Sequence, residues 1–227
     1  MPWVKQVPAI VQAWYLGSEA GHALAAMLTG DVPPSGKLPF TFPTSLEDVG
    51  AHRLDAFPGN ENQEPDSLYG QRLANVNYRE GLFVGYRWTD REGTRPLFPF
   101  GHGLSYTTFR YGKAKIDRKT MTASDTLHLT VPITNTGHRT GAEVVQLYIR
   151  DVTSSLPRPV KELKGFCKVR LEPGETNLFT FAIEHSALRF FDDKRHEWVA
   201  EPGRFEAFVA ASSTDIRCRA AFELTAD

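Results

Sequence analysis

The sequence is poor in cysteine, with only Cys167 and Cys218 among 227 residues. Two cysteines are too few for the disulfide framework of a small secreted domain, and their separation matches no zinc-ligand spacing. Cys167 alternates with Val169 and Leu171 between basic residues, as on one face of a strand. We therefore expect a buried, unpaired thiol that packs as a small hydrophobic side chain. The redox compartment stays open.

The chain also lacks an excess of either charge, and it lacks long apolar runs. Its 26 basic and 27 acidic residues leave a formal net charge of -1, so no concentrated positive charge favours a nucleic-acid or membrane-surface partner. No apolar run approaches the roughly 20 residues that span a bilayer, and the first residues lack the apolar core of a signal peptide. The seven histidines show no metal-ligand spacing. We expect neither a metal nor a cofactor, and the compartment stays open.

Residues 1 to 42 have the pattern of one α/β unit. The apolar stretch 7–14 predicts a strand that is buried on both faces. A helix should follow, with Ser18 as its N-cap and Gly30 as its C-terminal stop. After a turn, residues 38–42 predict a short edge strand. A single unit cannot bury both faces of its sheet, so we expect neighbouring strands outside this region.

The middle of the chain is less regular. Residues 43 to about 80 are polar and punctuated by proline and glycine, which predicts a long loop of a kind that is often functional or wrapped over another domain. Residues 80–88 then predict a strand. The aromatic, turn-rich stretch 97–106 is interpreted as a connector packed between layers.

The second half has the pattern of an all-β domain. Apolar and polar residues alternate in four runs, at 127–133, 145–149, 179–183 and 205–211. Turn signals at 172–174 and 201–203 separate them. This pattern predicts an antiparallel immunoglobulin-like β-sandwich. We expect an α+β protein with an α/β remnant at 1–106 and the sandwich domain at 107–227.

Three sequence blocks carry a resemblance to a known family. Residues 7–43 contain VPAIVQAWYLGSEAG, LTGD and SGKLPFTFP; residues 78–109 contain YREGLFVGYR and FPFGHGLSYTTF; residues 145–176 contain VQLYI, RPVKELKGF and LEPGET. In this order they resemble the end of the α/β sandwich domain, followed by the fibronectin type III-like domain, of family 3 glycoside hydrolases of the β-glucosidase type. The resemblance covers nearly the whole chain.

The resemblance implies retaining hydrolysis of β-linked sugars from a non-reducing end, by two carboxylates about 5–5.5 Å apart. In the family the nucleophile is an aspartate on an N-terminal barrel, and the acid/base is a glutamate upstream of the strand that corresponds to 7–14. Both positions fall outside these residues, so we assign no catalytic residue and name no substrate-binding residue. The start at Met1 suggests a truncated frame or one chain of a split enzyme.

We therefore expect the accessory C-terminal part of such an enzyme, inactive alone. Its partners would be a barrel chain or a second copy and, for the complete enzyme, a β-linked oligosaccharide. A different class of function stays open, in which a stand-alone sandwich module binds carbohydrate or protein, because this fold does not specify a function. Against that alternative, the second half shows no run of aromatics that would form a sugar-stacking platform.

Several carboxylates invite a catalytic interpretation. Glu61, Glu64 and Asp66 form an acidic cluster, but a solvated loop offers nothing to desolvate one of them and raise its pKa. Glu80 and Arg87 are expected to form an ion pair that holds the predicted strand in place, rather than to contact substrate. We expect structural or solvated roles for all of these residues.

Other candidate residues have structural interpretations as well. His102 lies between two glycines, but no serine or cysteine nucleophile motif accompanies it. Residues 17–21 place their serine second and are not a nucleophile elbow. Trp14, Trp88 and Tyr86 have rings that suit sugar stacking, yet their apolar strand patterns favour core packing.

Overall fold

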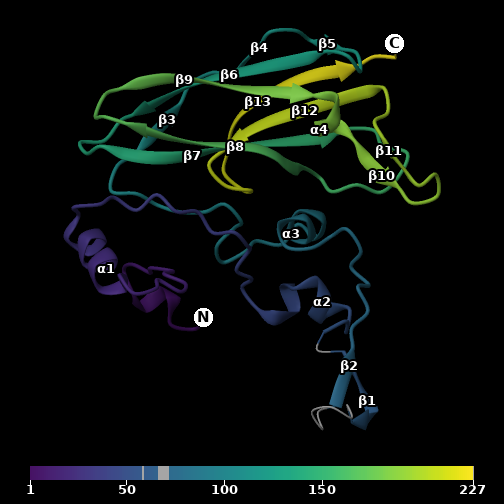
Figure 1. Cartoon of the computed structure of the whole chain (residues 1–227), viewed down its shortest axis with the longest axis horizontal. Coiled ribbons are helices and arrows are strands. Elements are labelled where there is room, and N and C mark those ends of the chain that lie inside the picture. Colours follow the sequence, from purple (N-terminus) through teal and green to yellow (C-terminus); the bar gives the residue numbers. More distant parts are fainter. Residues whose placement is uncertain (58, 66–71, 227) are drawn as a thin grey trace.

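The computed structural model describes residues 1–57, 59–65 and 72–226. A β-sandwich occupies one side of the molecule, and the residues that precede it lie along one face of that sandwich with little regular structure (Figure 1). We refer to residues 1–106 as the N-terminal segment and to strands β3 to β13 as the sandwich.

The sandwich contains two main sheets. The first has the order β5-β13-β12-β7-β8, and the second has the order β3-β6-β4 with β9 also paired to β6. The first sheet is built from β5 (Thr120–Met121), β7 (Gly141–Asp151), β8 (Glu162–Leu171), β12 (Gly203–Ala210) and β13 (Ile216–Leu224). The second is built from β3 (Phe109–Tyr111), β4 (Lys115–Ile116), β6 (Thr126–Asn135) and β9 (Thr176–Glu184). Neighbouring strands are antiparallel except β13 and β5, which are parallel.

A short helix and a hairpin complete the sandwich. Helix α4 (His185–Leu188) follows β9, and β10 (Phe190–Asp192) pairs antiparallel with β11 (Glu197–Val199) as a separate two-stranded sheet. The four alternating runs thus all form strands, and the predicted sandwich is confirmed.

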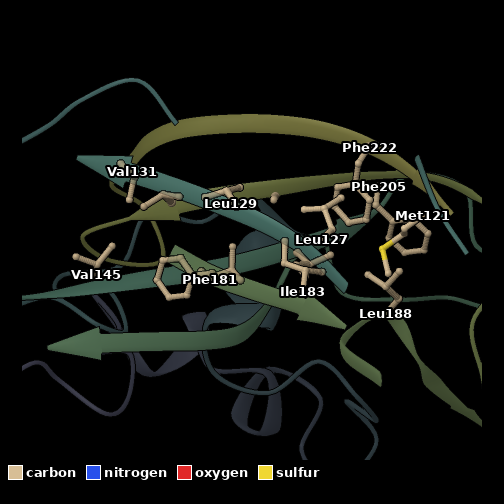
Figure 2. Packing of buried hydrophobic residues seen from close by; sticks show 14 of the residues in the cluster. Met121, Leu127, Leu129, Val131, Val145, Phe181, Ile183, Leu188, Phe205 and Phe222 are labelled. Carbon is tan, nitrogen blue, oxygen red and sulfur yellow. The ribbon is translucent and has the colours of Figure 1, made fainter. Parts of the chain in front are cut away.

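The core lies between the two main sheets. Every second side chain of β6 is fully buried, namely Leu127, Leu129, Val131 and Ile133. Figure 2 shows that the cluster around them includes Phe181 and Ile183 from β9 and Phe205 and Phe222 from the other sheet. Burying one such side chain stabilises the fold by about 1.5–3 kcal/mol, so this cluster is the main source of stability.

Strand β7 departs from simple alternation. Its inward residues are buried as predicted, but Gln146 and Tyr148 on the other face are also buried, at 3% and 0% exposure. Tyr148 belongs to a second cluster, against which Tyr86 and Phe100 of the N-terminal segment pack. The outer face of β7 is therefore covered by the N-terminal segment rather than by water.

The N-terminal segment contains short elements. They are a 3-10 turn η1 (Val4–Gln6), α1 (Ala20–Thr29), a 3-10 turn η2 (Leu46–Asp48), α2 (Gly50–Arg53), β1 (Asn60–Pro65), β2 (Arg72–Asn75) and α3 (Tyr86–Glu92). The helix predicted after residue 18 is confirmed as α1, and Gly30 ends it in the left-handed conformation. The N-cap is Glu19 without a side-chain cap, so the prediction for Ser18 was wrong.

The strand predicted at 7–14 is not present. These residues have no regular structure, and Val7, Ile10 and Val11 are 39–49% exposed. A central strand needs hydrogen-bonded neighbours on both sides, and no described strand pairs with this stretch. The predicted strand at 38–42 is reduced to one bridge, Phe42 to Phe98.

The strand predicted at 80–88 is a turn that leads into α3. Gly81 and Gly85 adopt φ of 58° and 62°, in the left-handed region that glycine tolerates and extended strands exclude. The amides of Trp88 and Thr89 then bond to the Gly85 carbonyl and begin the helix. The loop predicted from 43 to 80 contains α2 and the β1–β2 hairpin. None of the helices in the described part of the chain has the length and hydrophobicity that spanning a bilayer requires.

Candidate functional site

The strongest cluster of specific interactions joins the N-terminal segment to β7, β8 and β12. We call this interface the seam. At its centre Tyr86 stacks on Phe100 at 5.0 Å and meets Tyr148 edge-on at 5.8 Å. The Tyr86 hydroxyl accepts a 2.9 Å hydrogen bond from the backbone N–H of Leu163 in β8. Core packing of Tyr86 was predicted correctly, although it lies at the start of α3 rather than in a strand.

A buried glutamine connects three backbone segments at the seam. Gln146 Nε2 donates to the carbonyls of Gly101 (3.1 Å) and Ala211 (2.9 Å), while its Oε1 accepts from the Tyr148 hydroxyl at 2.7 Å. Gly101 has φ of 78°, and a Cβ placed there would lie 2.2 Å from Gln146 Oε1. The 97–106 connector therefore requires a glycine where it crosses β7.

The first ion pair across the seam joins Lys37 to Glu143 of β7. Lys37 Nζ lies 2.8 Å from Glu143 Oε1, with 12% and 10% of the side chains exposed. Lys37 also donates to the carbonyl of Gly103 at 2.8 Å. It thereby fixes the 38–42 region to the connector and to the sandwich together.

A second ion pair joins α3 to the residue before β8. Lys161 Nζ lies 2.5 Å from Asp90 Oδ2, and the two side chains are 10% and 13% exposed. Burial raises the pKa of Asp90, while the hydrogen bond and charge of Lys161 act in the opposite direction. The Lys161 ammonium also lies 5.8 Å from the centre of the Tyr148 ring.

The third group of charges centres on Glu162. It pairs with Arg158 at 2.6 Å and with Arg87 of α3 at 3.3 Å, while Arg158 also pairs with Asp151 at 3.0 Å. Burial opposes ionisation of Glu162, but Lys164, Arg158 and Arg87 together lower its pKa. Arg87 thus has the structural role that was expected, with Glu162 rather than Glu80 as its partner.

The buried carboxylates of the seam are therefore neutralised, since Asp90, Glu143, Asp151 and Glu162 each contact a cation. Glu80 differs. It is 8% exposed, and its Oε2 makes no hydrogen bond with the described residues. The predicted Glu80–Arg87 pair is wrong, because the turn before α3 replaces the strand on which it was based.

The acidic cluster of the middle region is only partly described. Glu61 and Glu64 lie on β1 rather than in a loop, and Asp66 lies outside the described residues. No group of three or more potential metal ligands occurs in the described part of the chain.

His102 lies in a cleft of about 510 Å³ between the connector and the β12–β13 turn. Thr94, Arg95, Ser212 and Asp215 also line it. The His102 ring stacks on Phe98, at 5.8 Å between ring centres, and burial together with Lys37 lowers its pKa. The Ser212 hydroxyl accepts from the Asp215 amide. No hydrogen bond joins Ser212 to His102 in the described structure, so the two do not form a nucleophile–base pair.

The two tryptophans predicted to be in the core behave differently. Trp88 is 2% exposed, and the Arg91 guanidinium lies 4.4 Å from the centre of its ring, so that prediction is confirmed. Trp14 is 52% exposed with φ of 50° and touches Phe40 edge-on, so its core assignment was wrong. The strand that would have buried Trp14 is not formed.

Both thiols are free and partly buried. Cys167 packs against the core, and burial raises its pKa; the expected role holds, with less burial than predicted. Cys218 donates to the carbonyl of Gly112 at 2.9 Å, and its pKa is also raised by burial.

Sequence reasoning missed Lys37, Asp90, Glu143 and Lys161. The available signal was weak. Glu143 is one charged residue on the apolar face of β7, and Gln146 lies on the opposite face, where the alternation predicts exposure. Nothing local indicates that a second layer covers the other face.

The fold matches two family descriptions. Residues 1–86 match the glycosyl hydrolase family 3 C-terminal domain, and residues 143–213 match the fibronectin type III-like domain. Beta-glucosidase BoGH3A of Bacteroides ovatus is 51% identical over 98% of this chain and 28% of its own length. Thermostable beta-glucosidase B of Acetivibrio thermocellus is 42% identical over 95% of this chain and 27% of its own length.

Solved structures agree. A Bifidobacterium adolescentis family 3 β-glucosidase superposes with a TM-score of 0.85 at 35% identity, covering 98% of this chain and 31% of that one. The Kluyveromyces marxianus β-glucosidase in complex with glucose gives 0.83 at 37% identity, covering 99% and 25%. This chain spans about a quarter of the length of the curated relatives named above.

Fold and matches together define the class: the end of an α/β domain, joined by a charged seam to a fibronectin type III-like sandwich. The chain belongs to glycosyl hydrolase family 3, in which it corresponds to the C-terminal portion of the enzyme.

Proposed function

We propose that these residues support a retaining β-glucosidase-type active site and are inactive alone. One observation carries this proposal: the N-terminal segment leaves large apolar side chains in water. Tyr15 is 102% exposed, Leu28 69% and Trp14 52%, and α1 has no buried residue. Trp14 also lies against Phe40, which is 40% exposed, so these rings form an exposed apolar patch. Such patches mark interaction sites, and we propose that the rest of the family 3 domain matched by residues 1–86 covers this one.

The ion pairs of the seam also support this proposal. Three of its ion pairs, Lys37–Glu143, Arg87–Glu162 and Lys161–Asp90, join the N-terminal segment to the sandwich at 2.5–3.3 Å. Their carboxylates are therefore suited to fix one domain on another rather than to transfer protons. We propose that the nucleophile and the acid/base come from protein outside these 227 residues, on the same chain or on a partner, and that the substrate is a β-linked glucoside.

We also propose that the domain boundary falls between Tyr106 and Thr107. The Tyr106 hydroxyl donates to the Met27 carbonyl at the end of α1. Thr107 instead donates to the buried Asn135 side chain at the end of β6, at 2.6 Å. Neighbouring residues thus belong to different hydrogen-bond networks.

The first test is an assay of the purified chain on p-nitrophenyl β-glucoside and on its xyloside, galactoside and N-acetylglucosaminide analogues. We expect no turnover. Turnover that follows the protein through purification would mean that a working carboxylate pair lies within these residues, and the proposal would fail.

A gain-of-function test complements the assay. The Bacteroides ovatus relative, with its matching C-terminal quarter replaced by this chain, should hydrolyse the glucoside, whereas the same protein without that quarter should not. A folded chimera without activity would contradict the supporting role.

A further inference from the structure

The β10–β11 hairpin displays two aromatic rings on its outer face. Phe191 pairs with Trp198 across the strands, and Phe190 pairs with Val199. Phe190 faces the sandwich, where the Arg158 guanidinium lies 5.1 Å from the centre of its ring. Because side chains alternate along a strand, Phe191 and Trp198 point the other way. They are 49% and 65% exposed.

The two rings form one small patch. Their centres are 5.7 Å apart and their planes cross at 65°, so the two rings are not stacked face to face and do not cover each other's faces. Covering both would bury on the order of 300 Å², well below the roughly 800 Å² per partner of a stable protein interface. The patch therefore fits a small flat ligand better than a second protein.

The surroundings of the patch are polar and of mixed charge. Arg195 and Glu197 form an exposed ion pair at 2.7 Å, and Asp193 and Lys194 in the hairpin turn are exposed. A neutral ligand with an apolar face and hydroxyls around its edge matches this combination. The β-glucopyranose ring has that form, because its equatorial hydroxyls leave C–H groups on both faces.

We propose that the hairpin is a glycan-binding site, in which a β-linked glucose unit stacks on Trp198 beside the edge of Phe191. Side chains of the turn, Arg195 and Lys194 among them, donate to its hydroxyls. The ligand class rests on the proposed function; the site itself rests on the exposed ring pair. The hairpin lies at the end of the sandwich opposite α1 (Figure 1), so an extended glycan can reach it without meeting the exposed apolar residues of α1.

The test is affinity electrophoresis of the full 227-residue chain in gels that contain soluble β-glucan, supported by calorimetry with cellopentaose. We expect retardation of the native chain. Trp198→Ala should weaken binding at least tenfold, and Phe191→Ala should weaken it less. Phe166→Ala is the matched control, because Phe166 is an exposed ring (69%) on β8 in the same domain and should bind like the native chain.

Each other outcome overturns the site. The site is contradicted if β-glucan does not retard the native chain, or if an α-linked glucan retards it equally. It is also contradicted if folded Trp198→Ala binds glucan as well as the native chain does, or if this substitution abolishes self-association of the chain and leaves glucan binding unchanged. Thermal unfolding of each variant establishes that it is folded. Turnover of p-nitrophenyl glucoside by the chain would defeat the proposed function while leaving this binding result intact, so the two failures can be told apart.

Discussion

The sandwich and the N-terminal segment contain similar apolar residues with different fates. In the sandwich, Leu127 and Leu129 of β6 are fully buried against the facing sheet. In the N-terminal segment, Leu28 of α1 is 69% exposed, and no residue of that helix is buried. A hydrophobic pattern thus identifies which face of a helix or strand is apolar. Whether that face is buried depends on a second helix or sheet packing against it, which the pattern does not specify.

The comparison is sharper within the N-terminal segment itself. Residues 80–106, together with Lys37, make the seam, where Trp88 is buried and Tyr86 is held between rings. Residues 1–30 expose most of their apolar side chains. The segment is therefore anchored mainly through residues 80–106 and Lys37, and residues 1–28 present most of the uncovered apolar surface.

The largest expected effect is in the sandwich core. Leu129→Ala leaves a cavity between the sheets and should lower the free energy of unfolding by about 3–5 kcal/mol. Leu28→Ala removes the same atoms from the exposed face of α1 and should change it by no more than about 0.5 kcal/mol. Urea denaturation followed by circular dichroism measures both values. Similar losses for the two variants would show that α1 is covered in solution.

The next effect is at the seam. Lys161→Met leaves the Asp90 carboxylate buried without its cation, which should lower the free energy of unfolding by about 2–4 kcal/mol. The transition should become less cooperative, because the N-terminal segment loses a contact with β8. Denaturant unfolding followed by tryptophan fluorescence, which reports mainly the N-terminal segment through Trp3, Trp14 and Trp88, and by far-ultraviolet circular dichroism, which reports mainly the sandwich, separates the two parts.

The control for this variant is the double substitution Asp90→Leu with Lys161→Met. An apolar pair of similar size removes the unpaired charge, so most of the lost stability should return. If the double variant is as unstable as the single one, packing around Lys161 rather than charge neutralisation holds the seam.

The pH dependence of the seam gives a smaller effect. The pKa of Glu162 is lowered in the folded protein, so ionised Glu162 contributes stability that is present above its ordinary value of 4.5 and is lost as pH falls through the folded value. Glu162→Gln should therefore cost about 1–2 kcal/mol at pH 7, and the deficit should shrink on acidification. Unfolding at pH 7 and near pH 4 measures it.

The matched control is Glu197→Gln on the exposed hairpin. Its ion pair with Arg195 is more than half exposed, and such pairs contribute little. We expect less than about 0.5 kcal/mol at either pH. A deficit for Glu162→Gln that grows at low pH would contradict the assigned direction.

Sequence patterns predicted the sandwich because neighbouring residues are enough to specify its strands. The alternation of apolar and polar residues identifies the buried face of β6, and turn residues mark where strands end. They predicted α1 for the same reason. They failed at 7–14 and 80–88, where apolar composition was interpreted as strand. The first stretch has no described neighbour to pair with, and the second contains Gly81 and Gly85, whose positive φ makes a turn.

The seam and the aromatic hairpin were beyond such patterns for a different reason. Lys161 and Asp90 are 71 residues apart in sequence. In the sequence each resembles an ordinary surface charge, and only the packing of α3 on the sandwich brings the two together. Phe191 and Trp198 become one patch only through the register of β10 and β11. A search for consecutive exposed aromatics therefore overlooked them.

The smallest expected effect on the chain itself is at Trp14, on the exposed face of the N-terminal segment. Trp14→Ala should change the stability of the chain by less than about 0.5 kcal/mol, because half of the ring is already in water in the folded chain. In the Bacteroides ovatus chimera the same substitution should cost about 3 kcal/mol or more, since a covered tryptophan loses both packing and buried area. Thermal unfolding of both proteins measures the difference. Equal effects in the two contexts would mean that the exposed face of the N-terminal segment is not where the rest of the enzyme packs.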